Sequence, residues 1–172
     1  MATIGIIFSD VQVRAALAGW TTEHRVPIVP QPRPVGIGRW QWGWKYGASK
    51  CRAPRSINWC EETLYPMHAA DRHPLTEYAE WQPGDWLWVK ERWANSGQVD
   101  ADEPGIVYRA TDPEWSYYEG WRWRSPSQMP RWASRLTLKV KRVRVERRSE
   151  TGLWIWGWVI DFRKMTKQKG QT

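Results

Sequence analysis

Arginine and tryptophan are interleaved in the C-terminal half of the sequence, and the two side chains suit the two halves of a nucleotide. The residues concerned are Arg109, Arg122, Trp123, Arg124, Arg131, Trp132 and Arg135. A guanidinium can contact a phosphate through two nitrogens, and an indole ring offers a flat face on which a base can stack. The set therefore predicts a surface that binds RNA, single-stranded DNA or a nucleotide. The alternative is that the tryptophans fill a core and the arginines are solvated.

Glu91 is a second candidate, because it follows an apolar run and lies between Lys90 and Arg92. A carboxylate at the end of a buried strand can serve a site or can form an ordinary ion pair. The sequence leaves both interpretations open.

Two cysteines and two histidines could form a zinc site: Cys51, Cys60, His68 and His73. Compact zinc sites place their ligands in closely spaced pairs, and these four residues are widely spaced. We therefore expect no metal and no other cofactor, and interpret the cysteines as free thiols.

Composition narrows the class of protein. The chain of 172 residues carries 26 Lys and Arg against 18 Asp and Glu, a net charge of +8 that suits a polyanionic partner. Its 16 tryptophans are more than one small core can hold, so we expect several at the surface. Residues 1–4 do not resemble a signal peptide, and the longest apolar run, residues 153–160, is too short to span a bilayer. We expect a cytoplasmic protein without a membrane partner.

The elements that must position these residues are mostly strands. Residues 4–8 predict a strand, and a short helix follows with Ser9 as its N-cap, Gln12 completing a capping box and Gly19 as its C-cap. Residues 86–89 are apolar on both faces and predict a buried strand, and residues 106–110 predict another. Tryptophan and arginine alternate over residues 121–124, which predicts opposite faces of one more strand.

The apolar positions of residues 136–145 change parity. Leu136, Leu138 and Val140 share one face of a strand, whereas Val143 and Val145 require the other. A bulge or bend near residues 141–142 would return both sets to one face. Residues 153–162 predict the last strand.

Together these elements predict a single α+β domain, mainly β, over residues 1–172. Few, long and bent strands favour a closed antiparallel barrel over a sandwich. Residues 26–81 have weak periodicity and predict a long irregular insertion, and residues 163–172 predict a flexible basic tail.

Three stretches resemble the ASCH-domain family. Residues 8–25 are similar to the opening motif of that family. Residues 82–94 are similar to a second motif, in which Pro-Gly-Asp is followed by an apolar strand and a glutamate, here Glu91. Residues 108–110 follow in their usual place, and residues 125–147 resemble the long C-terminal motif of phage and prophage members. The resemblance covers roughly residues 4–25 and 82–162 and leaves residues 26–81 without a counterpart.

The resemblance implies a PUA-like β-barrel with a nucleic-acid-binding cleft, to which Arg25 would contribute a phosphate contact unless it forms a structural ion pair. Some family members are hydrolases of acylated cytidines that use a lysine, a threonine and a glutamate. Those positions fall at Thr21, His24 and Glu91 here, so only the glutamate is retained. Threonine cannot replace a lysine whose pKa is tuned by burial. We therefore expect binding rather than catalysis.

Two alternatives remain. The first is a hydrolase or nuclease acting on modified nucleosides or RNA, in which His24 and Glu91 form an acid–base pair. The second is a module that binds another protein through exposed tryptophans.

Overall fold

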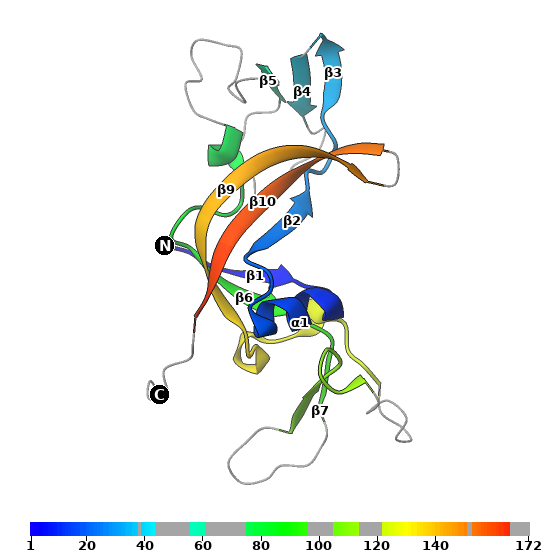
Figure 1. Ribbon diagram of the computed structural model, residues 1–172, viewed down its shortest axis with the longest axis vertical. Coiled ribbons are helices and arrows are strands. Elements are labelled where there is room, and N and C mark those ends of the chain that lie inside the picture. The colour runs from blue at the N-terminus through cyan, green and yellow to red at the C-terminus, as the bar shows by residue number, and fades with distance from the viewer. Residues whose placement is uncertain are drawn as a thin grey trace. The chain divides into compact units, whose positions relative to one another are not determined.

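The computed structural model describes residues 1–37, 39–43, 56–60, 75–95, 105–113, 122–150 and 153–165. These residues form one α-helix, ten β-strands and short 3-10 turns, so the protein is α+β and mainly β, as predicted (Figure 1). The chain divides into two compact units. Unit 1 comprises Met1–Thr22, Gly84–Lys139 and Phe162–Thr172, and unit 2 comprises Glu23–Pro83 and Val140–Asp161.

Unit 1 begins with strand β1 (Thr3–Ile7) and helix α1 (Asp10–Ala18). Ser9 accepts from the Gln12 amide, and the Gln12 side chain accepts from the Ser9 amide at 2.8 Å, which is the predicted capping box. Gly19 ends the helix with a φ of 77°, a left-handed conformation that glycine adopts without strain. The local sequence signals therefore set both ends of this helix.

The sheet of unit 1 joins β1 to β6 (Trp86–Lys90) and to the start of β9 (Thr137–Glu150). β1 runs parallel to β6, with Thr3 opposite Trp86 and Gly5 opposite Trp88, and β9 runs antiparallel to β6. Side chains alternate between the two faces of a strand. One face carries the buried side chains of the core: Ile6, Leu87, Val89 and Leu138. The prediction that β6 is buried on both faces is wrong, because Trp86 and Trp88 are only half-buried.

A smaller sheet in unit 1 pairs β7 (Trp93–Asn95) with β8 (Ile106–Tyr108). The 3-10 turns η3 (Pro126–Gln128) and η4 (Arg131–Ala133) lie between β8 and β9 along the chain. Residues 122–124 form only an isolated bridge between Arg124 and Trp93, and not the predicted strand. Trp93, Met129 and Ala133 are buried together and form a small core under these turns.

Unit 2 contains more regular structure than we predicted. β2 (Glu23–Pro27) pairs with β10 (Leu153–Met165), and β3 (Arg33–Gly36), β4 (Arg39–Gly43) and β5 (Ser56–Cys60) form an antiparallel three-stranded sheet. A 3-10 turn, η1 (Leu75–Tyr78), follows. The prediction of an irregular segment over residues 26–81 is therefore wrong for these strands, whose cross-strand pairing the periodicity did not reveal.

β9 and β10 are long neighbouring strands that each continue from one unit into the other (Figure 1). Val140 and Val143 are both buried, whereas Lys141 and Arg142 between them are both exposed. This is the change of parity that the sequence shows; the bulge itself stays a prediction. β10 extends to Met165, so residues 163–165 are not part of a loose tail, and the rest of that predicted tail lies outside the described residues.

The strands fall into sheets of five, three and two strands, the largest in the order β1-β6-β9-β10-β2. Among the described residues, no closed barrel is found. No helix in this part of the chain is long and apolar enough to cross a membrane.

His24 makes the stability of unit 2 depend on pH. It lies on β2 with only 8% of its surface exposed, and burial lowers the pKa of its imidazole from 6.5 to about 4. As the pH falls, the unfolded chain therefore binds the proton before the folded chain does. The contribution of the neutral His24 to the free energy of unfolding is fully present above pH 6.5. It decreases by roughly 3 kcal/mol as the pH approaches 4.

We expect His24→Phe to remove this dependence. Denaturant unfolding of parent and variant at a series of pH values checks it, because their difference isolates the histidine from the titrating carboxylates. A difference in free energy of unfolding that stays constant from pH 7 to pH 4 would contradict the prediction.

Candidate nucleic-acid interface

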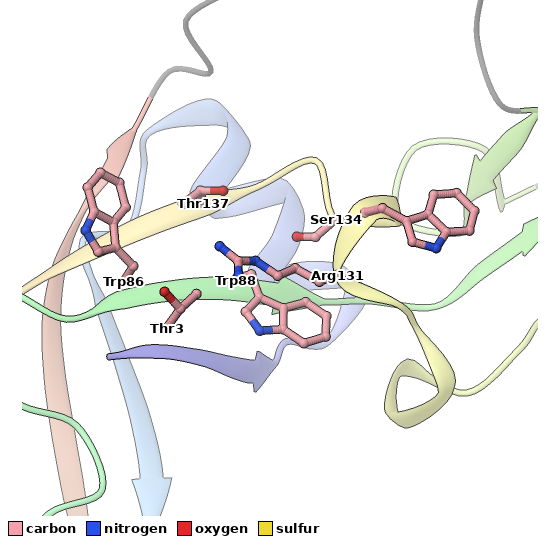
Figure 2. Close-up of a pocket in the computed structure, with 7 residues that line it drawn as sticks. Thr3, Trp86, Trp88, Arg131, Ser134 and Thr137 are labelled. Carbon is pink, nitrogen blue, oxygen red and sulfur yellow. The ribbon is translucent and has the colours of Figure 1, made fainter. Parts of the chain in front are cut away.

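The face of the unit 1 sheet opposite its core carries a pocket of about 580 Å³. We call it the tryptophan pocket, and its lining residues are Thr3, Trp86, Trp88, Arg131, Trp132, Ser134 and Thr137 (Figure 2). Its volume lies within the range of small-molecule sites, which is ~300–1,000 Å³. Three indoles, a guanidinium and hydroxyl groups therefore surround a space large enough for a nucleotide.

The alternation of β6 produces this face. Leu87 and Val89 point into the core, so Trp86, Trp88 and Lys90 must lie on the opposite side of the sheet. The neighbouring strand makes room for them at Gly5, where a Cβ atom would lie 2.8 Å from the Trp88 ring and 2.6 Å from the Lys90 side chain. Glycine at this position therefore lets the indole lie close against β1.

Cations surround the tryptophans of the pocket. The Lys90 ammonium lies 4.7 Å from the centre of the Trp88 ring, and the Lys139 ammonium lies 5.6 Å from that of Trp86. Figure 2 shows the Arg131 side chain extending from η4 toward β6. Within the described residues, none of these three cations forms an ion pair with a carboxylate. The face is thus both aromatic and positively charged.

A buried ion pair holds the turn that supplies Arg131 and Trp132. Glu91 follows β6 directly and is fully buried, and both of its oxygens accept from Arg135, Oε1 from Nε at 3.0 Å and Oε2 from Nη2 at 2.9 Å. The Arg135 guanidinium also lies 4.0 Å from the centre of the Tyr108 ring. Burial raises the pKa of Glu91, and Arg135 counters that rise. The geometry favours a positioning role for Glu91 over a site carboxylate.

Further hydrogen bonds fix the same segment. The Ser134 hydroxyl donates to the Val89 carbonyl at 2.8 Å, and the Tyr108 hydroxyl donates to the Ala133 carbonyl at 2.7 Å. The Glu91 amide donates to the sulfur of Met129 at 3.4 Å. Residues 129–135 are therefore bound to the end of β6 and to β8 by buried contacts.

The remaining predicted arginines of unit 1 lie apart from the lining of the pocket. Arg109 forms an ion pair with Asp10 at 3.6 Å. Arg122 and Arg124 are exposed, and the Arg124 guanidinium stacks over Trp93 at 5.1 Å. Trp123 is half-buried. Of the predicted binding residues, the pocket brings together Arg131 and Trp132.

Four described arginines of unit 2 pair with carboxylates of the same unit: Arg25, Arg142, Arg144 and Arg148. Arg144 donates to Asp161 at 2.9 Å and to Glu23 at 3.0 Å, and it also pairs with Glu146. Arg142 bonds the other oxygen of Asp161 at 2.9 Å. Burial alone would raise the pKa of Asp161, but its hydrogen bonds from the two arginines outweigh burial and lower it. Arg142 and Arg144 of β9 are therefore part of a network of ion pairs with Glu23, Glu146 and Asp161.

Arg25 belongs to this network in unit 2. Its guanidinium donates to the carbonyls of Glu146 and Ile155 at 3.2 and 3.0 Å and lies 3.7 Å from the Glu146 carboxylate. This arrangement favours the structural alternative over a phosphate contact.

The proposed acid–base residues fall in different units. Thr21 and Glu91 belong to unit 1, whereas His24 belongs to unit 2. Above a pH of about 4 the buried His24 imidazole is neutral, because burial lowers its pKa. The acid–base pair therefore stays a hypothesis.

Three of the four candidate zinc ligands, Cys51, His68 and His73, lie outside the described residues, and Cys60 ends β5. The described residues contain no group of three or more potential ligands.

Sequence reasoning missed Trp86 and Trp88 as site residues. Their alternation with Leu87 and Val89 could have indicated a strand with one exposed aromatic face, but the unbroken apolar run suggested burial on both sides. The hydroxyls of Thr3 and Thr137 carried no signal, because only strand pairing places them beside the tryptophans.

No family model matches the chain, and comparisons with curated proteins and with solved structures likewise give no match.

Removing Arg135 should destabilise unit 1 in a pH-dependent way. In Arg135→Gln the buried Glu91 loses its cation, which costs about 3–5 kcal/mol at neutral pH. The pKa of Glu91, which burial already raises, rises further when the arginine is removed. The folded state then keeps its proton at pH values where the unfolded chain has released it, so stability falls as pH rises above about 4.5.

Denaturant unfolding between pH 4 and pH 8 checks this prediction. Arg122→Gln is the matched control, because it removes an exposed arginine of the same unit. Equal losses of stability at both ends of the pH range would show that Glu91 does not carry the effect.

Proposed function

We propose that this protein binds nucleic acid or a nucleotide at the tryptophan pocket of unit 1. One observation carries the proposal: Trp86, Trp88 and Trp132 line one pocket together with Arg131. Stacking surfaces and a phosphate-binding cation are thereby combined in a single site.

Charge distribution supports the same site. In unit 2, Arg142, Arg144 and Arg25 are paired with carboxylates, so they attract a polyanion weakly. Around the pocket, the two carboxylates nearest in sequence to β6 are both occupied and buried, Asp85 by the Ala2 amide and Glu91 by Arg135. Among the described residues, the pocket therefore has Arg131, Lys90 and Lys139 beside it without a carboxylate partner, which favours an anionic ligand.

The lysines above the tryptophans do not block stacking. An exposed cation–π contact contributes ~0.5–1 kcal/mol, whereas stacking a base on an aromatic side chain contributes ~1–3 kcal/mol. A base can thus displace the ammonium of Lys90 from Trp88 with a net gain. The displaced lysine stays close enough to attract the phosphate that accompanies the base.

The resemblance to the ASCH family leads us to propose further that the chain is a PUA-like domain of the phage and prophage type. The capping box of α1 and the strand β6, which Glu91 directly follows, support this proposal, because they lie in the motifs that carry the resemblance. The same proposal includes a closed β-barrel and, for a phage-encoded protein, a location in the cytoplasm of the host.

Binding is favoured over the two alternatives. In the hydrolase, Glu91 would need an oxygen available to the substrate, yet Arg135 occupies both. A protein-binding module would use exposed tryptophans such as Trp20, whose surface is 85% exposed. Trp20 is not part of the pocket lining, so the two modes of binding can be separated by substitution.

The salt dependence of binding tests the proposal. We expect the affinity for a single-stranded oligonucleotide to fall steeply with salt, because phosphate contacts release counterions. Lys139→Gln with Arg131→Gln should weaken binding and reduce the slope of log K against log salt by ~0.7 for each phosphate that the variant no longer neutralises. Fluorescence anisotropy of a labelled strand at several salt concentrations measures the slope.

The matched control removes the same charge from unit 2. Arg142→Gln with Arg148→Gln takes away two cations that pair with Asp161, Glu146 and Glu23. We expect the slope to stay close to that of the parent. If the slope falls as much as in the pocket variant, binding depends on the overall charge of the protein, and the proposal that it occurs at the pocket is wrong.

A further inference from the structure

We infer that the tryptophan pocket receives one unpaired base of a single-stranded nucleic acid, stacked against indole, while Lys90, Lys139 and Arg131 hold the strand's phosphates. The inference rests on the proposed function and names the substrate class, a single strand with its bases accessible. It follows from the three tryptophans of the pocket lining, the placement of the cations and the size of the pocket.

The pocket offers several rings against which a base can stack. Trp86 and Trp88 alternate with Leu87 and Val89 on β6, and both line the pocket. The face of an indole can stack one base, which contributes ~1–3 kcal/mol. Trp132, with 64% of its surface exposed, adds a third ring at the rim.

Each of the two β6 rings has a cation against it. Lys90 lies against Trp88 and Lys139 against Trp86, while Arg131 comes from η4 and lines the pocket. A base stacked on either ring would therefore have a cation close to the phosphate that accompanies it. Thr3 and Thr137 add hydroxyls that can donate to or accept from the edge of any base, which makes the site tolerant of sequence.

A double helix does not meet these requirements. Its bases are already stacked on both faces, and one must leave the stack before an aromatic side chain can reach it. A pocket of about 580 Å³ holds a nucleotide and not a duplex. Affinity should therefore depend on an accessible base as well as on phosphates.

Abasic strands test the inference directly. The full chain is titrated with three labelled probes of equal length: a single strand that contains 2-aminopurine, the same backbone without bases, and a duplex. We expect the single strand to bind at least about 5-fold, and up to about 150-fold, more tightly than the abasic strand, with quenching of 2-aminopurine. The duplex carries more phosphates, and because its bases are already stacked its affinity should come from phosphate contacts alone and stay unchanged in Trp132→Leu.

Substitutions then locate the contact. Trp132→Leu changes an exposed residue and Trp88→Leu a half-buried one, and each should reduce the preference for bases while leaving the salt slope unchanged. Trp20→Leu is the matched control, because it removes an exposed tryptophan of the same unit outside the pocket lining, and it should leave the preference intact.

Each contrary result has a separate meaning. Equal affinity for the normal and abasic strands, with steep salt dependence, would overturn the stacking of a base while nucleic-acid binding stands. A preference that survives both pocket substitutions would also overturn it. Absence of salt-dependent binding to every probe would overturn the proposed function as well.

Discussion

The ion pair between Glu91 and Arg135 is the contact on which the candidate site depends. It joins the end of β6 to the segment that carries Arg131 and Trp132, and it does so in a place where Glu91 is fully buried. A buried carboxylate without its cation is costly, so the two partners must stay together in the folded state. The hydroxyls of Ser134 and Tyr108 add hydrogen bonds to the same segment. Buried and partly buried polar contacts therefore hold in place the segment that supplies Arg131 and Trp132 to the pocket.

Strand β6 links this interior to the surface. Leu87 and Val89 fill the core, and the same alternation turns Trp86 and Trp88 outward. A half-buried tryptophan contributes less to stability than a fully buried one, because it keeps part of its apolar area in water. That arrangement suits a stacking surface, and Gly5 supports it by leaving space where any other side chain would meet the Trp88 ring.

Charge alone would have directed attention to another part of the chain. The strand β9 is rich in arginine, yet Arg144 and Arg142 are engaged by Asp161 in unit 2. The charge of an ion-paired guanidinium is already neutralised by its carboxylate, and some of its N–H groups are used. Its attraction for a phosphate is therefore weaker. The net charge of +8 therefore does not show where on the surface the cations without a carboxylate partner lie, and among the described residues Lys90, Lys139 and Arg131 beside the tryptophan pocket are such cations.

The sequence by itself determined the local elements: the capping box of Ser9 and Gln12, a strand at residues 86–89 and the change of parity after Val140. It also marked Arg131 and Trp132 as candidates. Such features depend on neighbours within a few residues, so the sequence pattern is enough to predict their hydrogen bonds and the alternation of their side chains. The pairing of Glu91 with Arg135, the sheet in residues 33–60 and the outward face of β6 were decided only by the tertiary structure. These features join residues far apart in the chain, and a run of apolar residues does not show which of its faces will be covered.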